Sequence, residues 1–236
     1  MSDPEHESSA STDSGSALQL QDITRRFTSG DQTLTVLDGL SLRLNSGESL
    51  AITGPSGSGK STLLQIIGTL DRPDEGSLMI AGQDPFSLSE SDLATFRGQA
   101  IGFIFQDYHL LPQLSVVENV LIPTLALGNV TEAQRERAES LIEAVGLADR
   151  MGHRPGQLSG GQKERVAIAR SLIMEPTVML ADEPTGNLDR RTADEVTELL
   201  LKMQTQANAV MIVVTHSDEL SKAMGKRHEL QDGKLV

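Results

Sequence analysis

The sequence predicts an α/β fold with a mostly parallel sheet that is covered on both faces. Two observations support this prediction. Short apolar runs at 49–53, 101–105, 178–181 and 210–214 have the length and composition of buried strands. Stretches whose apolar residues have helical spacing lie between these runs. Strands that alternate with helices in this way are typical of a parallel sheet with helices on both sides.

The bulk composition narrows the classes of protein. A chain of 236 residues is long enough for one domain, or for one domain with a subdomain, and can bury a sizeable core. The net charge of −13 argues against a general nucleic-acid binder, whose affinity comes mostly from Lys and Arg on phosphates. The absence of cysteine excludes disulfides and thiolate zinc sites, and it suits a reducing cytoplasm.

Residues 1–17 are rich in Ser, Asp and Glu and nearly lack apolar side chains, so we expect a disordered acidic tail. They contain no apolar segment of the kind found in signal peptides. Apolar runs elsewhere, such as 210–214, are far shorter than a membrane span. If the protein serves a membrane process, we expect another chain to supply the membrane part.

The segment 18–236 is expected to form the folded domain. Alternating apolar residues between 18 and 44 predict β-strands, and 78–81 predicts another. The run at 210–214 is interpreted as the last central strand. Residues 229–236 are predicted to form a small hairpin around an Asp-Gly turn.

A mainly helical subdomain is expected from about 89 to 160. The capping-box pairs within Thr131–Gln134 and Ser159–Gln162 predict the starts of two helices. In the second helix, the charged pair Lys163–Glu164 is placed on a solvated face.

One stretch between the strand at 49–53 and a helix matches the phosphate-loop pattern G-x-x-x-x-G-K-[ST]. Such a loop points backbone N–H groups into one hollow at a helix N-terminus, where phosphates bind. We expect Lys60 to reach the β- and γ-phosphates of a nucleotide and the Ser61 hydroxyl to ligate Mg²⁺. The alternative is a Gly/Ser-rich turn without a ligand, and the strand–loop–helix context favours phosphate binding. The stretch consists of Gly54, Pro55, Ser56, Gly57, Ser58, Gly59, Lys60 and Ser61.

The strand at 178–181 ends in two carboxylates, Asp182 and Glu183. Because α/β sheets bind ligands at the carboxyl ends of their strands, Asp182 could hold Mg²⁺ through water. Glu183 is a candidate general base that polarises the attacking water. His216 follows the strand at 210–214 and could hydrogen-bond the γ-phosphate at the same edge. Any one of these residues alone could simply end a strand, and the phosphate loop beside them favours a catalytic role.

Two further residues are candidates for ligand contacts. Gln106 lies where the strand at 101–105 runs into a loop, and its amide could touch Mg²⁺ and the attacking water. Phe27 could stack on a nucleotide base, although core packing is the ordinary role of a phenylalanine.

Together these motifs resemble the ATP-binding-cassette (ABC) ATPases. The signature Leu158-Ser159-Gly160-Gly161-Gln162 precedes Asp182 and Glu183, and the run Pro184–Asp189 follows them. The resemblance covers Leu18–Val236. It implies a phosphate-loop NTPase fold of the ABC type, with a mostly parallel central sheet, an antiparallel β subdomain and an inserted helical subdomain.

The resemblance also implies roles around the nucleotide, with ATP and Mg²⁺ as the ligands. Phe27 matches the base-stacking aromatic, where a tyrosine is commoner in the family. Thr62 extends the phosphate loop, in which Lys60 contributes to catalysis. Gln106 matches a residue that contacts Mg²⁺ and senses the membrane partner.

Other matches imply a shared site between two chains. Asp182 matches the Mg²⁺ carboxylate, Glu183 the catalytic base, Asp189 a dimer-contact aspartate and His216 the switch histidine. The signature residues Ser159, Gly160, Gly161 and Gln162 match those that contact the γ-phosphate held by the opposite subunit. Because a signature cannot reach its own nucleotide, the resemblance implies a homodimer that sandwiches two ATP molecules head to tail.

Within the family, 101–112 and Gly186–Asp189 resemble the lipoprotein-releasing (LolD-type) and macrolide-exporter (MacB-type) ATPases. Bacitracin-resistance and division-type relatives share much of the first segment. The resemblance implies a permease partner with few membrane spans and a large external domain. It also implies a peripheral location on the cytoplasmic side of the inner membrane.

Three other functions are alternatives to this one. A regulatory ATPase of the division type would transmit force through a membrane partner without moving a substrate. A soluble ATP-driven clamp for DNA repair or translation is disfavoured by the acidic charge and by the lack of a long coiled-coil insertion. A simple kinase or GTPase would need neither the signature nor Glu183.

Overall fold

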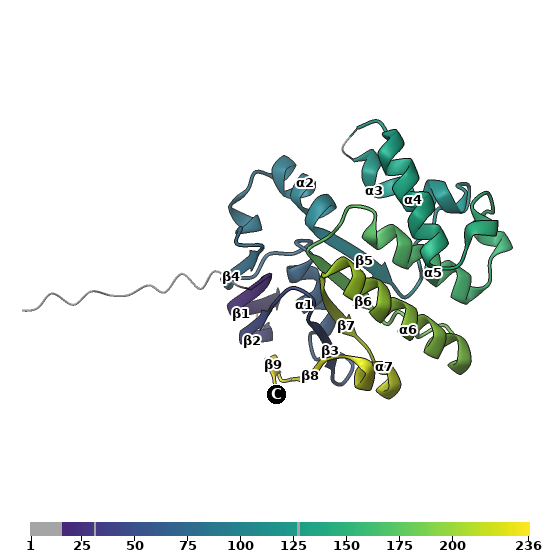
Figure 1. The fold of residues 1–236 in the computed structure, drawn as a ribbon. Coiled ribbons are helices and arrows are strands. Elements are labelled where there is room, and N and C mark those ends of the chain that lie inside the picture. The colour runs from purple at the N-terminus through teal and green to yellow at the C-terminus, as the bar shows by residue number, and fades with distance from the viewer. Residues whose placement is uncertain (1–15, 31, 127) are drawn as a thin grey trace, which may run out of the picture.

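The computed structural model describes residues 16–30, 32–126 and 128–236, which form two β-sheets and a set of helices (Figure 1). The predicted tail, 1–17, lies outside the described residues except for its last two positions. Ala17 is already buried, and its carbonyl accepts a hydrogen bond from the Ala81 N–H at 2.9 Å.

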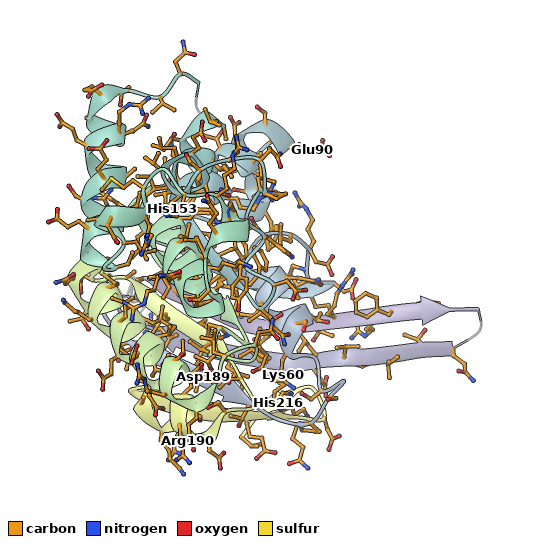
Figure 2. All side chains as sticks on the ribbon, turned by 90° about the vertical axis from the view of Figure 1, so that its right-hand side faces the viewer. Lys60, Glu90, His153, Asp189, Arg190 and His216 are labelled. Atoms are coloured by element: carbon orange, nitrogen blue, oxygen red, sulfur yellow. The ribbon has the colours of Figure 1, made fainter. Side chains whose placement is uncertain are left out.

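A small antiparallel sheet contains the strands predicted between 18 and 44 and the strand near 78. Its order is β2-β1-β4, and β1 pairs with both neighbours in antiparallel register. Gly30, with a φ of 59°, lies at the turn between β1 and β2, and their long hairpin projects from the body of the molecule (Figure 2). The antiparallel part of the predicted fold is confirmed. The strands are β1 (Leu18–Ser29), β2 (Gln32–Leu44) and β4 (Glu75–Ile80).

The central sheet has the order β5-β6-β7-β3-β8-β9. The strands from β5 to β8 are parallel, and β9 returns from β8 as an antiparallel hairpin. The mostly parallel sheet is therefore confirmed. Its strands are β5 (Ile101–Phe105), β6 (Val178–Asp182), β7 (Val210–Val214), β3 (Ser49–Thr53), β8 (Lys226–Gln231) and β9 (Lys234–Leu235).

The interpretation of 210–214 as the last central strand was wrong. After β7 the chain forms β8, which pairs with β3 in parallel as well as forming the predicted hairpin with β9. In β8 only Leu230 is buried, and most of the other side chains are polar and exposed. So polar a strand lacks the apolar pattern by which a central strand is predicted from sequence. Its position in the sheet is seen only from its pairing with β3.

The central sheet is buried on both faces. In β3, Leu50 and Ile52 pack into one hydrophobic cluster with α1 (Lys60–Ile67) and the antiparallel sheet. Ala51 points the other way, into a second cluster that includes residues of α5 (Gly160–Leu172) and α6 (Arg190–Ala207). This double coverage explains why the central strands are continuous apolar runs rather than alternating ones.

The helices of the predicted 89–160 region lie in two places. Helix α2 packs against β5, whereas α3 and α4 lie farther from the antiparallel sheet and pack on α5 (Figure 1). The capping boxes at Thr131 and Ser159 are present, and a third one, Ser115 with Glu118, begins α3. The remaining helices are α2 (Glu90–Ala100), α3 (Val116–Leu125), α4 (Glu132–Ala144), α7 (Asp218–Ala223) and the short 3₁₀ turns Pro85–Ser87, Ala148–Arg150 and Pro155–Gln157.

The prediction that Lys163–Glu164 lies on a solvated face of α5 was wrong. Glu164 has a relative exposure of 0 % and Lys163 is only half-buried. The reason is that α5 packs against α3, α4, α6 and β5, so that little of its circumference faces solvent. Within the ranges that the structure describes, no helix is both long enough and apolar enough to cross a bilayer.

Candidate active site

The predicted phosphate loop joins β3 to α1 and has the backbone that its glycines permit. Gly54, Gly57 and Gly59 have φ values of 135°, 79° and 104°. A Cβ at Gly54 would collide with the carbonyl oxygen of Leu230, and one at Gly59 would lie 2.9 Å from the carbonyl oxygen of Val36. Positive φ and close backbone approach therefore both require glycine at these two positions.

Lys60 is the first residue of α1 and its side chain folds back over the loop. Its Nζ donates hydrogen bonds to the carbonyl oxygens of Gly54 and Pro55, both at 2.8 Å. With a relative exposure of 7 %, Lys60 brings a buried positive charge to the mouth of the loop.

The loop opens into a cavity of about 660 Å³. Residues from β5, β6 and β7 reach this cavity because the carboxyl ends of parallel strands meet at one edge of the sheet. Figure 2 shows Lys60 and His216 together at this edge. The structure thus brings together ten of the predicted site residues, which come from four separate stretches of the sequence. The lining residues are Val36, Ser56, Gly57, Gly59, Lys60, Ser61, Thr62, Gln106, Asp182, Glu183, Val214 and His216.

Glu183 is held in an unusual backbone conformation, with a φ of 48°. Its Oε2 accepts hydrogen bonds from the Thr215 hydroxyl and from the His216 backbone N–H, both at 3.2 Å. Its Oε1 is buried, has no hydrogen-bond partner among the described residues and lies 3.7 Å from His216 Nε2. Left-handed backbone at a non-glycine residue costs free energy and is concentrated at functional sites.

Asp182 lies one residue before Glu183, at the end of β6. Burial raises the pKa of the Asp182 carboxyl, and the negative charge of Glu183 raises it further. The Lys60 ammonium lowers this pKa but does not cancel the first two effects. Two neighbouring carboxyl groups thus line the cavity, and burial makes one of them costly to ionise.

Gln106 follows β5 directly and lines the cavity with an exposed side chain. Its backbone carbonyl accepts a hydrogen bond from the Asn187 Nδ2 at 2.9 Å. This bond joins the loop after β5 to the Pro184–Asp189 run, which follows the two carboxylates.

The signature residues do not line this cavity. Ser159 is the N-cap of α5: its Oγ accepts a hydrogen bond from the Gln162 N–H, and Gln162 Oε1 accepts one from the Ser159 N–H. Neither of them, nor Gly160 or Gly161, is among the lining residues.

Asp189 and Phe27 also lie outside the cavity lining. Asp189 is the N-cap of α6, and its Oδ2 accepts a hydrogen bond from the Thr192 hydroxyl at 2.6 Å. The hydrogen bonds from Thr192 lower the pKa of Asp189. Phe27 is not a core residue: its exposure is 43 %, and the Arg25 guanidinium lies 4.8 Å above its ring.

Sequence reasoning missed three residues of the site. Val36 and Val214 supply apolar wall, and Thr215 anchors Glu183. Thr215 stands between β7 and His216, so its position at the same sheet edge was a usable signal. Val36 comes from the β1–β2 hairpin, and its approach depends on how the two sheets pack.

Comparison with known proteins identifies the family. A family model described as "ABC transporter" matches residues 37–186. This chain is a member of the ABC transporter family. It is an ABC-type ATPase that binds ATP, as the resemblance implied.

Individual relatives of this ABC ATPase support the same assignment. The lipoprotein-releasing system ATP-binding protein LolD 1 of Rhodopirellula baltica is 57 % identical over 219 residues, which cover 93 % of this chain and 96 % of that protein. The macrolide export ATP-binding/permease protein MacB of Rhodopseudomonas palustris is 48 % identical over 94 % of this chain but only 34 % of its own length. Both relatives are named for transport systems, which supports the transporter prediction over the regulatory alternative.

Solved structures confirm the predicted ABC ATPase fold. A dimeric structure of MJ0796, a bacterial ABC transporter cassette, has a TM-score of 0.82 and 37 % identity, and the match covers 92 % of this chain and 96 % of that one. A dimeric post-hydrolysis state of the same cassette, bound to ADP and Pi, has a TM-score of 0.81 and 36 % identity over the same shares of the two chains.

Proposed function

We propose that this ABC ATPase is the ATP-hydrolysing subunit of a bacterial lipoprotein-releasing or macrolide-export system. The observation that carries the proposal is the cavity in which the phosphate loop, the two carboxylates and His216 meet. The relatives named LolD and MacB support the choice of system.

Within the cavity, Glu183 is the proposed general base. Its Oε2 is occupied by two donors, so the carboxylate cannot rotate freely, and its Oε1 has no partner among the described residues. That free oxygen is the atom that accepts a proton from the attacking water. His216 Nε2, at 3.7 Å from it, is the group that orients the water and contacts the γ-phosphate.

The phosphates are bound by the loop and by Lys60. The Lys60 ammonium exchanges the carbonyls of Gly54 and Pro55 for the β- and γ-phosphate oxygens, so that its charge remains paired. Thr62 and Gly57 complete the cradle from α1 and from the loop. Phe27, which is half-exposed, is assigned to stacking on the base.

The residues at the cavity also fit a Mg²⁺ ion. Ser61, Gln106 and Asp182 line the same cavity and offer a hydroxyl, an amide and a carboxylate oxygen, the ligand type that Mg²⁺ prefers. Burial and the charge of Glu183 raise the pKa of Asp182, and a cation bound beside it would stabilise its ionised form. When bound, Mg²⁺ neutralises charge on the transferred phosphate.

Two copies of the chain are required for a complete site. Ser159 to Gln162 lie outside the chain's own cavity, at the N-terminus of α5, which is suited to bind an anion. We assign this terminus to the γ-phosphate held by a second copy, with Asp189 at the contact between copies. The dimeric state of the MJ0796 cassette supports this arrangement. Hydrolysis cleaves the γ-phosphate from the nucleotide, and its departure as inorganic phosphate removes the charge that holds the copies together. The separation of the copies then performs the work.

The work is delivered to a membrane permease with few spans and a large external domain. The proposed location is the cytoplasmic face of the inner membrane, where the chain is bound peripherally through that permease.

Size-exclusion chromatography with light scattering on Glu183→Gln tests the shared site. This variant keeps the shape of the base but cannot accept the proton, so ATP persists and we expect a monomer that dimerises only with Mg-ATP. The matched control is the double variant with Ser159→Arg, which is expected to bind ATP and remain monomeric. An equal dimer in both variants would contradict the role of the signature.

Depletion of the protein in its own bacterium tests the choice of system. Lipoproteins retained in the inner membrane would identify lipoprotein release, and increased sensitivity to macrolides would identify export. Neither effect, with ATP-dependent dimerisation intact, would contradict the assignment to these two systems while leaving the ATPase function in place.

A further inference from the structure

A buried acid in α5 has no part in the proposed hydrolysis. Glu164 follows the signature and is fully buried. Among the described residues, it is the one carboxyl group with both oxygens buried and without a hydrogen-bond partner.

This environment favours the neutral acid. An ionised carboxylate without a partner is very costly to bury, and such a group keeps its proton instead. Burial raises the pKa of Glu164 to about 8, although the charge of Arg170 lowers it. At neutral pH the carboxyl group is therefore mostly protonated.

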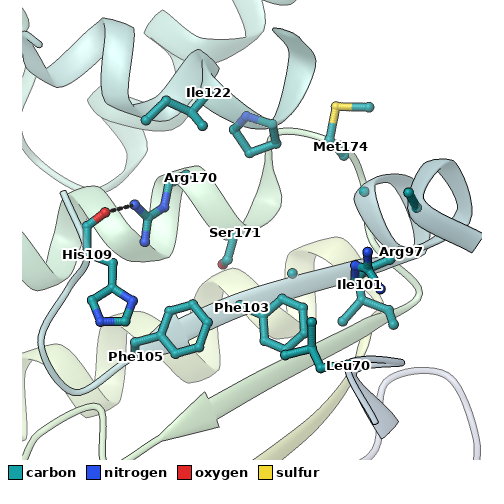
Figure 3. Close-up of a pocket in the computed structure, with 14 residues that line it drawn as sticks. Leu70, Arg97, Ile101, Phe103, Phe105, His109, Ile122, Arg170, Ser171 and Met174 are labelled. Carbon is teal, nitrogen blue, oxygen red and sulfur yellow. Dashed lines mark hydrogen bonds between the residues drawn. The ribbon is translucent and has the colours of Figure 1, made fainter. Parts of the chain in front are cut away.

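Arg170, farther along the same helix, is bonded to a different element. Its Nη1 donates to the His109 carbonyl oxygen and its Nη2 to the Tyr108 carbonyl oxygen, both at 2.7 Å. Figure 3 shows the first of these bonds beside the groove that Arg170 and His109 line. Tyr108 and His109 have φ values of 58° and 47°, so the two bonds hold a strained turn directly after Gln106.

Arg170 is the cation whose charge acts on Glu164, yet the two side chains form no ion pair in the described structure. An ionised Glu164 would compete with the two carbonyl oxygens for the guanidinium, because a charged acceptor binds it more strongly than a neutral one. We propose that Glu164 is a positioning residue whose neutral form leaves Arg170 free to hold the turn after Gln106 against the signature helix. Ionisation of Glu164 draws Arg170 away and uncouples the two segments.

The charged groups named next lie on elements packed against α5, and each has a partner other than Glu164. On α4, Arg137 donates to the carbonyl oxygens of Leu172 and Ile173. On α6, Glu195 pairs with Arg165, and Glu118 at the start of α3 bonds to Ser115. From the turn after β5, the hydroxyl of Tyr108 is the titratable group on which the charge of Glu164 acts. Asp107 also acts on this hydroxyl.

Tyr108 makes the proposal directly measurable, because the sequence contains one tyrosine and no tryptophan. Burial, Glu164 and Asp107 raise the pKa of Tyr108 above its usual value, so its own ionisation lies above the range of interest. A carboxylate that forms beside a tyrosine quenches its emission. In the full chain we expect a fall in tyrosine emission with a midpoint near pH 8, absent in Glu164→Gln.

The same variants test the coupling itself. ATP turnover of the wild type should fall roughly tenfold between pH 7 and pH 9, where a group with a pKa of about 8 is mostly ionised. Glu164→Gln should stay within about twofold across this range. Glu139→Gln, on the exposed face of α4, removes the same charge and should behave as the wild type.

Three results would overturn the proposal. One is an emission transition that persists in Glu164→Gln or is missing in the wild type. Another is an alkaline loss of turnover that is equal in the wild type and Glu164→Gln. If Glu164→Gln does not fold, infrared spectroscopy of the wild type replaces it: the absence of a protonated-carboxyl band at pH 7 would be the third. The emission and infrared measurements follow the titration of Glu164 in the single chain and need neither a permease nor a dimer. Their failure is therefore distinct from failure of the proposed function.

Discussion

Glu183 shows how one oxygen of a carboxylate can be fixed while the other is left without a partner. One oxygen is anchored by Thr215 and by the His216 N–H, while the other has no partner among the described residues. The left-handed backbone at Glu183 is maintained by a bond from its own N–H to the Val214 carbonyl oxygen. The left-handed backbone at Glu183 costs free energy, which these hydrogen bonds offset.

Thr215 is predicted to be a positioning residue for this base. Thr215→Val removes the hydroxyl that anchors Glu183 Oε2 and should lower the turnover number about tenfold with little change in KM for ATP. Steady-state kinetics measure both quantities. Thr215→Ser keeps the hydroxyl and should turn over ATP like the wild type. A change in Thr215→Val that is confined to KM would contradict the prediction.

For single residues, the sequence predicted most of those that line the candidate site. Lys60, Asp182 and His216 follow strands of one parallel sheet, so the rule that ligands bind at the carboxyl edge was enough to place them together. Glu164 was placed wrongly, on a solvated face, because a polar residue in a helix is ordinarily exposed and its burial here depends on four neighbouring elements.

At the scale of elements, the signature has two separable properties. Ser159 caps α5 in the same way that Thr131 caps α4, since both accept a hydrogen bond from the N–H three residues on. A cap stabilises the helix, and a helix N-terminus also attracts anions. The capping role alone would not distinguish the signature helix from any other.

Ser159→Asp separates these properties. Aspartate is as good an N-cap as serine, so the free energy of unfolding should change by less than about 1 kcal/mol. The added carboxylate repels phosphate, so ATP-dependent dimerisation of the Glu183→Gln background should be lost. Urea unfolding and light scattering measure the two effects. Thr131→Asp is the matched control and should leave dimerisation intact. If Ser159→Asp also dimerised with ATP, the signature would serve only as the N-cap of α5.

At the scale of the whole molecule, Glu164 should make the free energy of unfolding depend on pH. The folded pKa of about 8 lies above the ordinary value of 4.5 for a glutamic acid, so between these values the folded chain binds more protons than the unfolded chain. The contribution of the raised Glu164 pKa to the free energy of unfolding is complete below about pH 4.5 and is lost as the pH rises towards 8. The ionisation of all other groups contributes equally to the free energy of unfolding of the wild type and of a variant at position 164.

Glu164→Gln should therefore be more stable than the wild type by roughly 3 kcal/mol at pH 7 and about equally stable near pH 4.5. Urea unfolding at both pH values, with Glu139→Gln as control, measures the difference. A gap that does not widen with pH would show that Glu164 is ionised in the folded chain.

The place of β8 also determines when the protein can begin to function. The phosphate loop is made early, but β3 lies between β7 and β8, and Gly54 packs against the carbonyl of Leu230. A nascent chain halted after α6 lacks both neighbours of β3 and the backing of the loop. We therefore expect ATP binding to wait until β7 and β8 have left the ribosome, because both neighbours of β3 and the backing of the loop follow α6 in the sequence.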